Sequence, residues 1–233
     1  MKKIIFIAEI LVIVAITNLL QSCEKGILNP YIPIDKEGNL IDSGYYPNVP
    51  GSYWRYNIIL SDSIPVIIDS VEVRLVKNEI LQDSSQFLTY NYYHFRFGDI
   101  YSTNETIKKD SVIRFSNPTI KYKSFLLIPF KPGETYLETT NDTTFDTENL
   151  TIQMTIESYD SIRVKAGIFK AYKAVTTITY ERKGTAPLYS REILYFVPYI
   201  GFIKLENDFW DENYRKYISS EVWELTEYKI VKK

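Results

Sequence analysis

Side chains that carry acid–base, nucleophilic or metal chemistry are scarce in this chain. Its 233 residues include one histidine, His94, and one cysteine, Cys23. One histidine cannot form a histidine cluster, and one cysteine allows neither an intrachain disulfide nor a cysteine-based zinc site. His94 lies in an aromatic strand-like segment, where a hydrogen-bonded strand histidine is a simpler interpretation than a general base. No Gly-x-Ser-x-Gly elbow is present, so we expect no catalytic triad, no metal and no cofactor.

Acidic side chains are numerous, and an enzyme that uses two of them stays open as an alternative. A glycosidase needs two carboxylates that meet in space rather than in sequence. Most of the candidates fall on alternate polar positions or in turns, which is typical of a solvated sheet face. A carbohydrate-active enzyme is therefore the less favoured interpretation. The candidates are Asp69, Glu72, Asp99, Glu157, Asp160, Glu192, Glu206, Asp208 and Glu221.

The composition indicates a packed domain with no nucleic-acid partner. Apolar residues make up 45% of the chain and aromatic residues 15%, enough to build a core. The formal net charge is −2, so the chain lacks the basic excess that nucleic-acid binding requires.

Aromatic side chains form the most unusual pattern. Tyr90 and Tyr92 share one face of a predicted strand, and Trp54 and Tyr195 lie in other aromatic segments. Aromatic rings provide large, stiff contact surfaces with a polar tip, so these four residues are the candidate ligand face. The alternative is structural, because strands favour aromatic residues and cross-strand ring pairs stabilise sheets.

The elements that must position these rings are strands almost throughout. Val71, Val73 and Leu75 alternate with polar residues, and the segment from Leu150 to Ile156 does the same, which is the signature of half-buried strands. We expect an all-β fold: a curled antiparallel sheet, a half-barrel or barrel-like, with an apolar cavity on its concave side. Further strands are predicted at Tyr53–Leu60, Gln86–Phe97, Ile120–Phe130, Phe169–Glu181, Leu188–Val197, Gly201–Phe209 and Ile218–Tyr228.

The first residues have the pattern of a secretory signal. Two lysines precede an apolar run from Ile4 to Leu20, and Ser22-Cys23 follows it. This junction resembles the lipobox of bacterial lipoproteins, which implies cleavage after residue 22 and attachment of palmitate-type acyl chains to Cys23. An uncleaved membrane anchor is the alternative, and it is weakened by Glu9 and Asn18 within the run.

These patterns predict three regions of the chain. Residues 1–22 are the signal peptide, 23–50 a lipid-anchored tether rich in proline, and 51–233 one antiparallel β domain.

Several motifs resemble those of exported Bacteroidetes-type envelope lipoproteins of an uncharacterised family. They are Tyr45-Tyr46-Pro47 with Gly51-Ser52-Tyr53-Trp54-Arg55-Tyr56, Val164–Lys173, Tyr195–Lys204 and Glu224–Tyr228. The resemblance implies a domain similar to the curled half-barrels of outer-membrane lipoprotein carriers. It implies a location in the cell envelope rather than an activity.

These observations predict a non-enzymatic lipoprotein of a Gram-negative cell envelope, held in a lipid bilayer by acylated Cys23. The outer membrane is favoured, with its periplasmic or surface face left open. The protein would bind an apolar or amphipathic ligand, or an envelope protein partner. The alternative is a structural or assembly accessory of an outer-membrane complex.

Overall fold

We describe a computed structural model of the protein that covers residues 44–60, 66–108, 111–117, 120–140, 147–182, 184 and 186–232. The predicted signal peptide, Cys23 and most of the predicted tether lie outside these residues and stay predictions. No helix among the described residues is long and apolar enough to cross a membrane.

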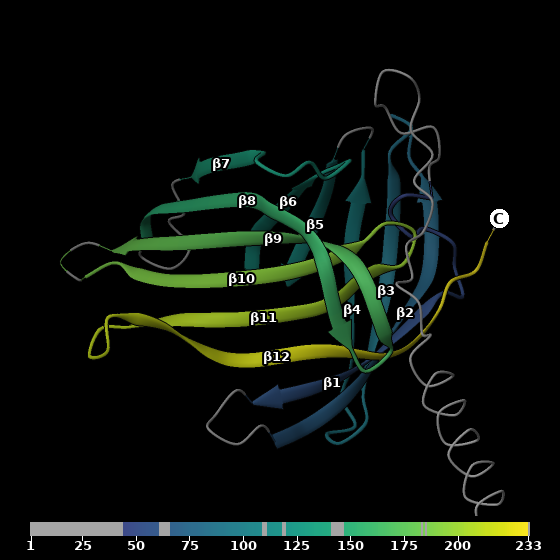
Figure 1. Cartoon of the computed structure of the whole chain (residues 1–233). Coiled ribbons are helices and arrows are strands. Elements are labelled where there is room, and N and C mark those ends of the chain that lie inside the picture. Colours follow the sequence, from purple (N-terminus) through teal and green to yellow (C-terminus); the bar gives the residue numbers. More distant parts are fainter. Residues whose placement is uncertain are drawn as a thin grey trace, which may run out of the picture.

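The described part of the chain is one antiparallel sheet of twelve strands, shown in Figure 1. The strands are β1 (Tyr53–Leu60), β2 (Val66–Ile80), β3 (Gln86–His94), β4 (Ile100–Ile107), β5 (Ser111–Asn117), β6 (Ile120–Leu127), β7 (Thr135–Thr140), β8 (Thr147–Val164), β9 (Gly167–Arg182), β10 (Leu188–Val197), β11 (Gly201–Asp211) and β12 (Lys216–Lys229). The predicted all-β, curled antiparallel fold is confirmed.

The sheet is an open meander with its two ends in the middle of the chain. Its spatial order runs from β6 through β1 to β12 and on to β7, so sequence neighbours pair everywhere except between β6 and β7. Pairing of β1 with β12, from Tyr53↔Lys229 onward, joins the two halves. In Figure 1 the half from β8 to β12 lies in front of β2 to β4, and the strands of the halves cross. The inner face of the curl is therefore enclosed between them.

Most strand predictions are confirmed within a few residues, and two match at both ends: Tyr53–Leu60 and Leu188–Val197. Three strands were not predicted, namely β4, β5 and β7. These strands are short, at six to eight residues, and their few apolar residues do not alternate regularly with polar ones. Pairing with neighbouring strands, which no local pattern indicates, stabilises them.

The packed domain begins earlier than the predicted boundary at residue 51. Tyr45 and Tyr46 are 1% and 4% exposed, although the sequence placed them in the tether. Their rings contact Phe196, which is fully buried, with centroid distances of 5.6 Å in both cases. The prolines near these two tyrosines indicate a linker. The rings pack against the concave face of the sheet instead, because removing their large apolar surface from water is favourable.

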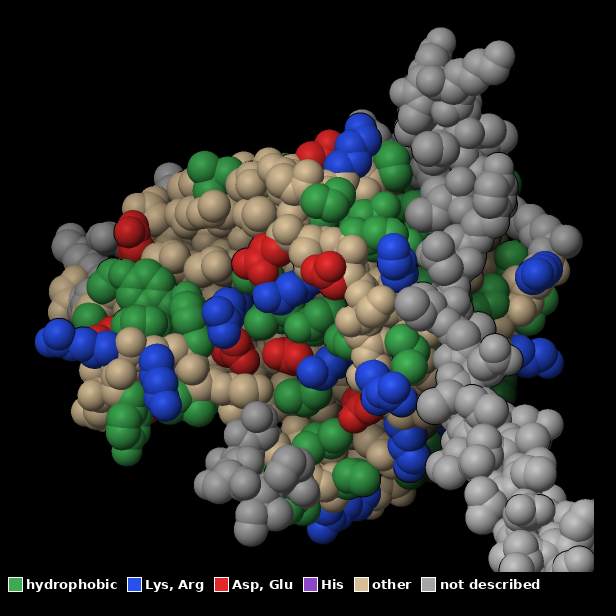
Figure 2. Space-filling view, in the orientation of Figure 1, with side chains coloured by type: hydrophobic (Ala, Val, Ile, Leu, Met, Phe, Trp, Pro, Cys, Tyr) green, Lys and Arg blue, Asp and Glu red, His purple; other side chains and the backbone are tan. Residues whose placement is uncertain are grey.

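The outer face of the sheet carries paired charges. Arg55 contacts both Glu72 and Glu227 at 2.7 Å, and Lys173 contacts Glu157 at 2.6 Å. Figure 2 shows basic and acidic side chains interspersed over the middle of this face. The expectation that the candidate carboxylates belong to a solvated sheet face holds for Glu157, whose side chain is 46% exposed. It is wrong for Glu72, which is buried between Arg55 and Arg74, and for Asp69 and Asp208, which are also buried.

Candidate functional site

A cavity of about 180 Å³ opens on the inner face of the curled sheet. Its wall combines residues from both halves of the sheet with the segment that precedes β1. Seven of the lining side chains are aromatic, and the polar ones are few. The lining residues are Tyr46, Pro47, Trp54, Tyr56, Val73, Tyr90, Tyr92, Glu105, Arg114, Gly201, Phe202, Leu205, Asn207 and Trp223.

Three of the four predicted ligand-face residues meet at this cavity: Trp54, Tyr90 and Tyr92. Alternation along each strand explains the grouping, since residues two apart point to the same face of a sheet. Trp54 and Tyr90 come from different strands, and their ring centroids lie 6.2 Å apart. Trp223 on β12 completes the wall, with its ring 6.4 Å from that of Tyr92.

Tyr195, the fourth predicted residue, is absent from the cavity lining. Its neighbour on β10, Phe196, is fully buried, so Tyr195 points to the opposite, outer face. There its ring lies under the ammonium group of Lys204, 5.5 Å away. Burial and the nearby Glu206 carboxylate raise the pKa of Tyr195 to about 12.

Gly201 lets the β10–β11 corner approach the cavity wall. Its φ of +101° is a conformation that side-chain-bearing residues rarely adopt. A β-carbon at this position would lie 3.3 Å from the indole nitrogen of Trp54. That indole donates a hydrogen bond to the Ile200 carbonyl at 2.5 Å. The β10–β11 corner and the Trp54 side chain therefore hold each other in position.

Several polar atoms of the aromatic wall are already bonded to the protein. The Tyr56 hydroxyl donates to the Phe202 carbonyl at 2.8 Å, and the Tyr46 hydroxyl donates to Glu105 at 2.6 Å. Burial is the main cause that raises the pKa values of Tyr46, Tyr56 and Tyr90 above the ordinary tyrosine value. These rings remain neutral at physiological pH, and they present mainly apolar surface to the cavity.

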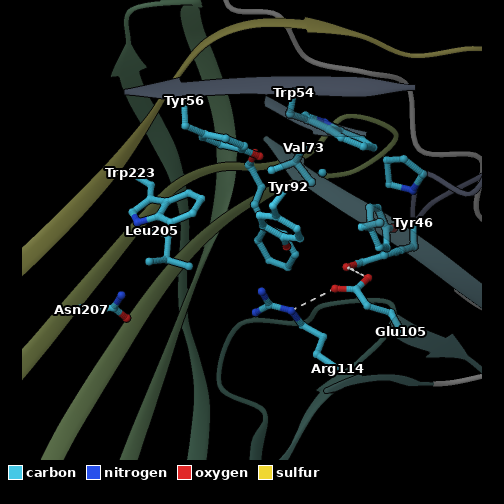
Figure 3. Close-up of a pocket in the computed structure, with 14 residues that line it drawn as sticks. Tyr46, Trp54, Tyr56, Val73, Tyr92, Glu105, Arg114, Leu205, Asn207 and Trp223 are labelled. Atoms are coloured by element: carbon cyan, nitrogen blue, oxygen red, sulfur yellow. Dashed lines mark hydrogen bonds and ion pairs between the residues drawn. The ribbon is translucent and has the colours of Figure 1, made fainter. Parts of the chain in front are cut away.

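The polar side of the cavity is an ion pair. Arg114 Nε donates to Glu105 Oε1 at 3.1 Å, and the guanidinium lies over the Phe202 ring at 4.9 Å. A second carboxylate, Glu192, is 3.8 Å from Arg114 Nη1. Burial alone would lower the pKa of Arg114, but the Glu192 and Glu105 carboxylates raise it, so the group stays charged. In Figure 3, Arg114, Glu105 and Asn207 lie along the lower side of the view, and Trp54, Tyr56 and Trp223 lie above them.

His94 lies beside the cavity wall rather than in it. Its Nδ1 donates to Asp69 at 2.6 Å, which confirms the hydrogen-bonded interpretation. The ring is stacked on Tyr101 and edge-on to Trp223, with centroid distances of 5.5 and 6.2 Å. Burial alone would raise the pKa of Asp69, but hydrogen bonds from the Arg96 amide, His94 and the Ser70 amide lower it. Asp69 thus fixes the imidazole against the wall.

No group of three or more His, Cys, Asp or Glu side chains suited to a metal ion occurs among the described residues.

Glu105 and Arg114 were not predicted as site residues. They belong to β4 and β5, two of the strands that the sequence did not reveal. One signal was present, because Tyr101, Thr103, Glu105 and Ile107 alternate with small polar residues. A single acid on the more apolar side of such an alternation marks a charge that points inward.

Comparison with known proteins gives a likeness of structure only, since no protein-family model and no curated protein matches the chain. A protein of Parabacteroides distasonis, provisionally described as a lipoprotein, has a TM-score of 0.53 at 14% identity. A Bacteroides fragilis protein, provisionally described as exported and with a YmcC-like fold, has a TM-score of 0.52 at 12% identity. Each comparison covers 79% of this chain and 98% of the other chain. The chain therefore shares the fold of these two Bacteroidetes proteins, which confirms the resemblance drawn from its motifs at the level of the fold.

Proposed function

We propose that this protein is a lipid-anchored envelope protein that binds an apolar or amphipathic ligand in the cavity on its concave face. The observation that carries the proposal is the cavity itself, which is walled by seven aromatic rings and has an ion pair at one side. Small-molecule sites are typically concave, mainly apolar and equipped with a few placed polar groups. A domain with a purely structural role would gain stability by filling this space.

The membrane anchor rests on the sequence. A basic start, an apolar run and Ser22-Cys23 form the signal pattern, and the two structural neighbours are themselves described as a lipoprotein and an exported protein. Two or more acyl chains on Cys23 give stable attachment to a bilayer, whereas one chain gives only reversible binding. We place the anchor in the outer membrane of a Gram-negative cell as part of the same proposal.

Substitution Cys23→Ala is expected to abolish acylation and to move the protein out of the membrane fraction or leave its signal uncleaved. The thiol is the only one in the chain, so no other residue can accept the thioether. Fractionation, with the mass of the N-terminal peptide, measures both effects. Ser22→Thr, which keeps the thiol, serves as the control. An acylated N-terminal peptide from Cys23→Ala would contradict the anchor.

Ligand binding is tested on the mature chain, residues 23–233, carrying Cys23→Ala so that no detergent is needed. After incubation with envelope lipid extract, native mass spectrometry should show a bound species on this protein. Tyr92→Ala, which opens the cavity wall, should reduce occupancy by about tenfold, equivalent to one lost aromatic contact of roughly 1.4 kcal/mol. Tyr93→Ala, the adjacent ring on the opposite face, is the matched control. No bound species on the parent protein would reject the proposed ligand binding.

A protein partner is the second candidate, favoured by apolar side chains at the β3–β4 turn. Phe95 and Phe97 are each 61% exposed, and Ile100 is 66% exposed. An exposed apolar cluster of this kind is a common contact site. A carbohydrate-active enzyme is less favoured, because Glu105 and Glu192 lie on either side of the Arg114 guanidinium rather than across an open space.

A further inference from the structure

We infer that the cavity selects an uncharged occupant about the size of one six-membered ring, and that the Glu105–Arg114 pair is what rejects charged ones. The inference deepens the proposed function and rests on it. It follows from three properties of the described lining: its volume, its remaining hydrogen-bonding groups and its balance of charge.

The volume limits the part of a ligand that enters. An apolar protein cavity of roughly 150 Å³ accommodates one benzene molecule. The present cavity, at about 180 Å³, is slightly larger. One ring or a short branched chain fits this space, and a long acyl chain does not. Any longer ligand must extend from the cavity along the concave face.

Few hydrogen-bonding groups are left for the occupant. The Trp54 indole and the hydroxyls of Tyr46 and Tyr56 already bond to the protein. The Tyr90 hydroxyl faces Glu105 and the Tyr92 hydroxyl faces Thr103, so the wall around a bound ring is mainly apolar. The Asn207 side-chain amide makes no hydrogen bond with the described residues. One amide beside the paired guanidinium matches a ligand with one or two polar atoms, such as an alcohol, ester or amide.

The charge of the lining cancels. Glu105 and Arg114 are the only acid and the only base among the lining residues, and they bond to each other. An anion in the cavity would meet Glu105 together with Glu192, and the only guanidinium nearby is already shared between those two. A cation would meet Arg114, while Glu105 is occupied by two donors, and Glu192 lies outside the lining and is paired with the same guanidinium. Either ion loses its hydration without gaining an unpaired counter-charge.

Three probes of one shape and three charges test this inference: cyclohexylmethanol, cyclohexanecarboxylate and cyclohexylmethylammonium. Binding to the mature Cys23→Ala chain is followed by the fluorescence of Trp54 and Trp223, which line the cavity. We expect the alcohol to bind at least about tenfold more tightly than either ion. A charged probe that binds as tightly as the alcohol overturns the inference and leaves the proposed function intact. Failure of all three probes to bind contradicts the proposed function as well.

Glu105→Gln supplies the decisive variant, because it keeps the shape and removes the acid. Arg114 then lacks its nearest carboxylate, and we expect the carboxylate probe to gain about tenfold in affinity. Glu157→Gln, at an ion pair on the outer face, is the matched control and should change nothing. Glu192→Gln should shift affinity in the same direction by a smaller factor, and it replaces Glu105→Gln if that variant fails to fold. No gain by the carboxylate probe in a folded variant overturns the assigned role of the pair.

Discussion

Replacing Phe196 by alanine is expected to lower the free energy of unfolding by about 3–5 kcal/mol, as is typical of a buried phenylalanine. The ring is completely buried at the point where the two halves of the sheet meet the segment before β1. Its centroid lies 4.8 Å from that of Phe130 and 5.4 Å from that of Phe202, in addition to the contacts with Tyr45 and Tyr46. Urea unfolding of the mature chain measures the loss.

The control for this substitution is Phe97→Ala, which removes the same atoms from an exposed ring. Its side chain is 61% accessible, so the cost should stay within about 0.5 kcal/mol. Similar midpoints for the two variants would show that the aromatic cluster at Phe196 does not hold the domain together. Since Tyr46 stacks on Phe196 and bonds to Glu105, Phe196→Ala should also weaken ligand binding.

Arg114→Met is expected to cost about 2–4 kcal/mol, because it leaves a buried carboxylate without its cation. The Glu105 side chain is 9% exposed and the Arg114 side chain 19% exposed, so little solvent is available to replace the lost partner. Methionine has a similar length and keeps much of the packing against Phe202. The measurement is again the free energy of unfolding in urea.

The double variant Glu105→Gln with Arg114→Met separates lost charge pairing from lost packing. With both charges removed, the one carboxylate left without its cation is Glu192, whose side chain is 24% exposed, so most of the stability lost in the single variant should return. If the double variant is no more stable than Arg114→Met, then packing rather than pairing explains the loss. That result would also weaken the assignment of this pair as the element that rejects charged ligands.

The sequence predicted the fold and three of the aromatic residues of the site for an identifiable reason. Trp54, Tyr90 and Tyr92 lie in strands with strong aromatic and β-branched character. The positions of these strands, and the face on which each side chain lies, could therefore be predicted. Tyr195 was misplaced because its segment is aromatic on both faces, and only the burial of Phe196 shows which face points inward. In such a segment apolar residues do not alternate with polar ones, so the pattern does not indicate which face is buried.

The rest of the site could not be predicted, because it depends on contacts between residues that are distant in the sequence. Glu105 and Arg114 lie in two short strands without a regular apolar alternation, and they meet residues far away in the sequence, such as Tyr46, Glu192 and Phe202. No local pattern shows that an acid on β4 will contact a hydroxyl 59 residues earlier. The buried tyrosines before β1 were missed similarly, because nearby prolines indicate a linker unless the concave surface that they fill is known.

The open meander has a consequence for the order in which the protein folds. Each ladder but one joins neighbouring strands, so each half of the sheet, β1–β6 and β7–β12, can assemble from short-range hairpins. The exception joins β1 to β12, where Tyr53 contacts Glu227 across 174 positions. Closing so long a loop costs roughly 2.5 kcal/mol more in chain entropy than closing a ten-residue hairpin. The transition state for folding should therefore contain preformed halves, with the β1–β12 seam as the last and slowest ladder to form. The ligand cavity, which needs residues from both sides of that seam, exists only after this final step.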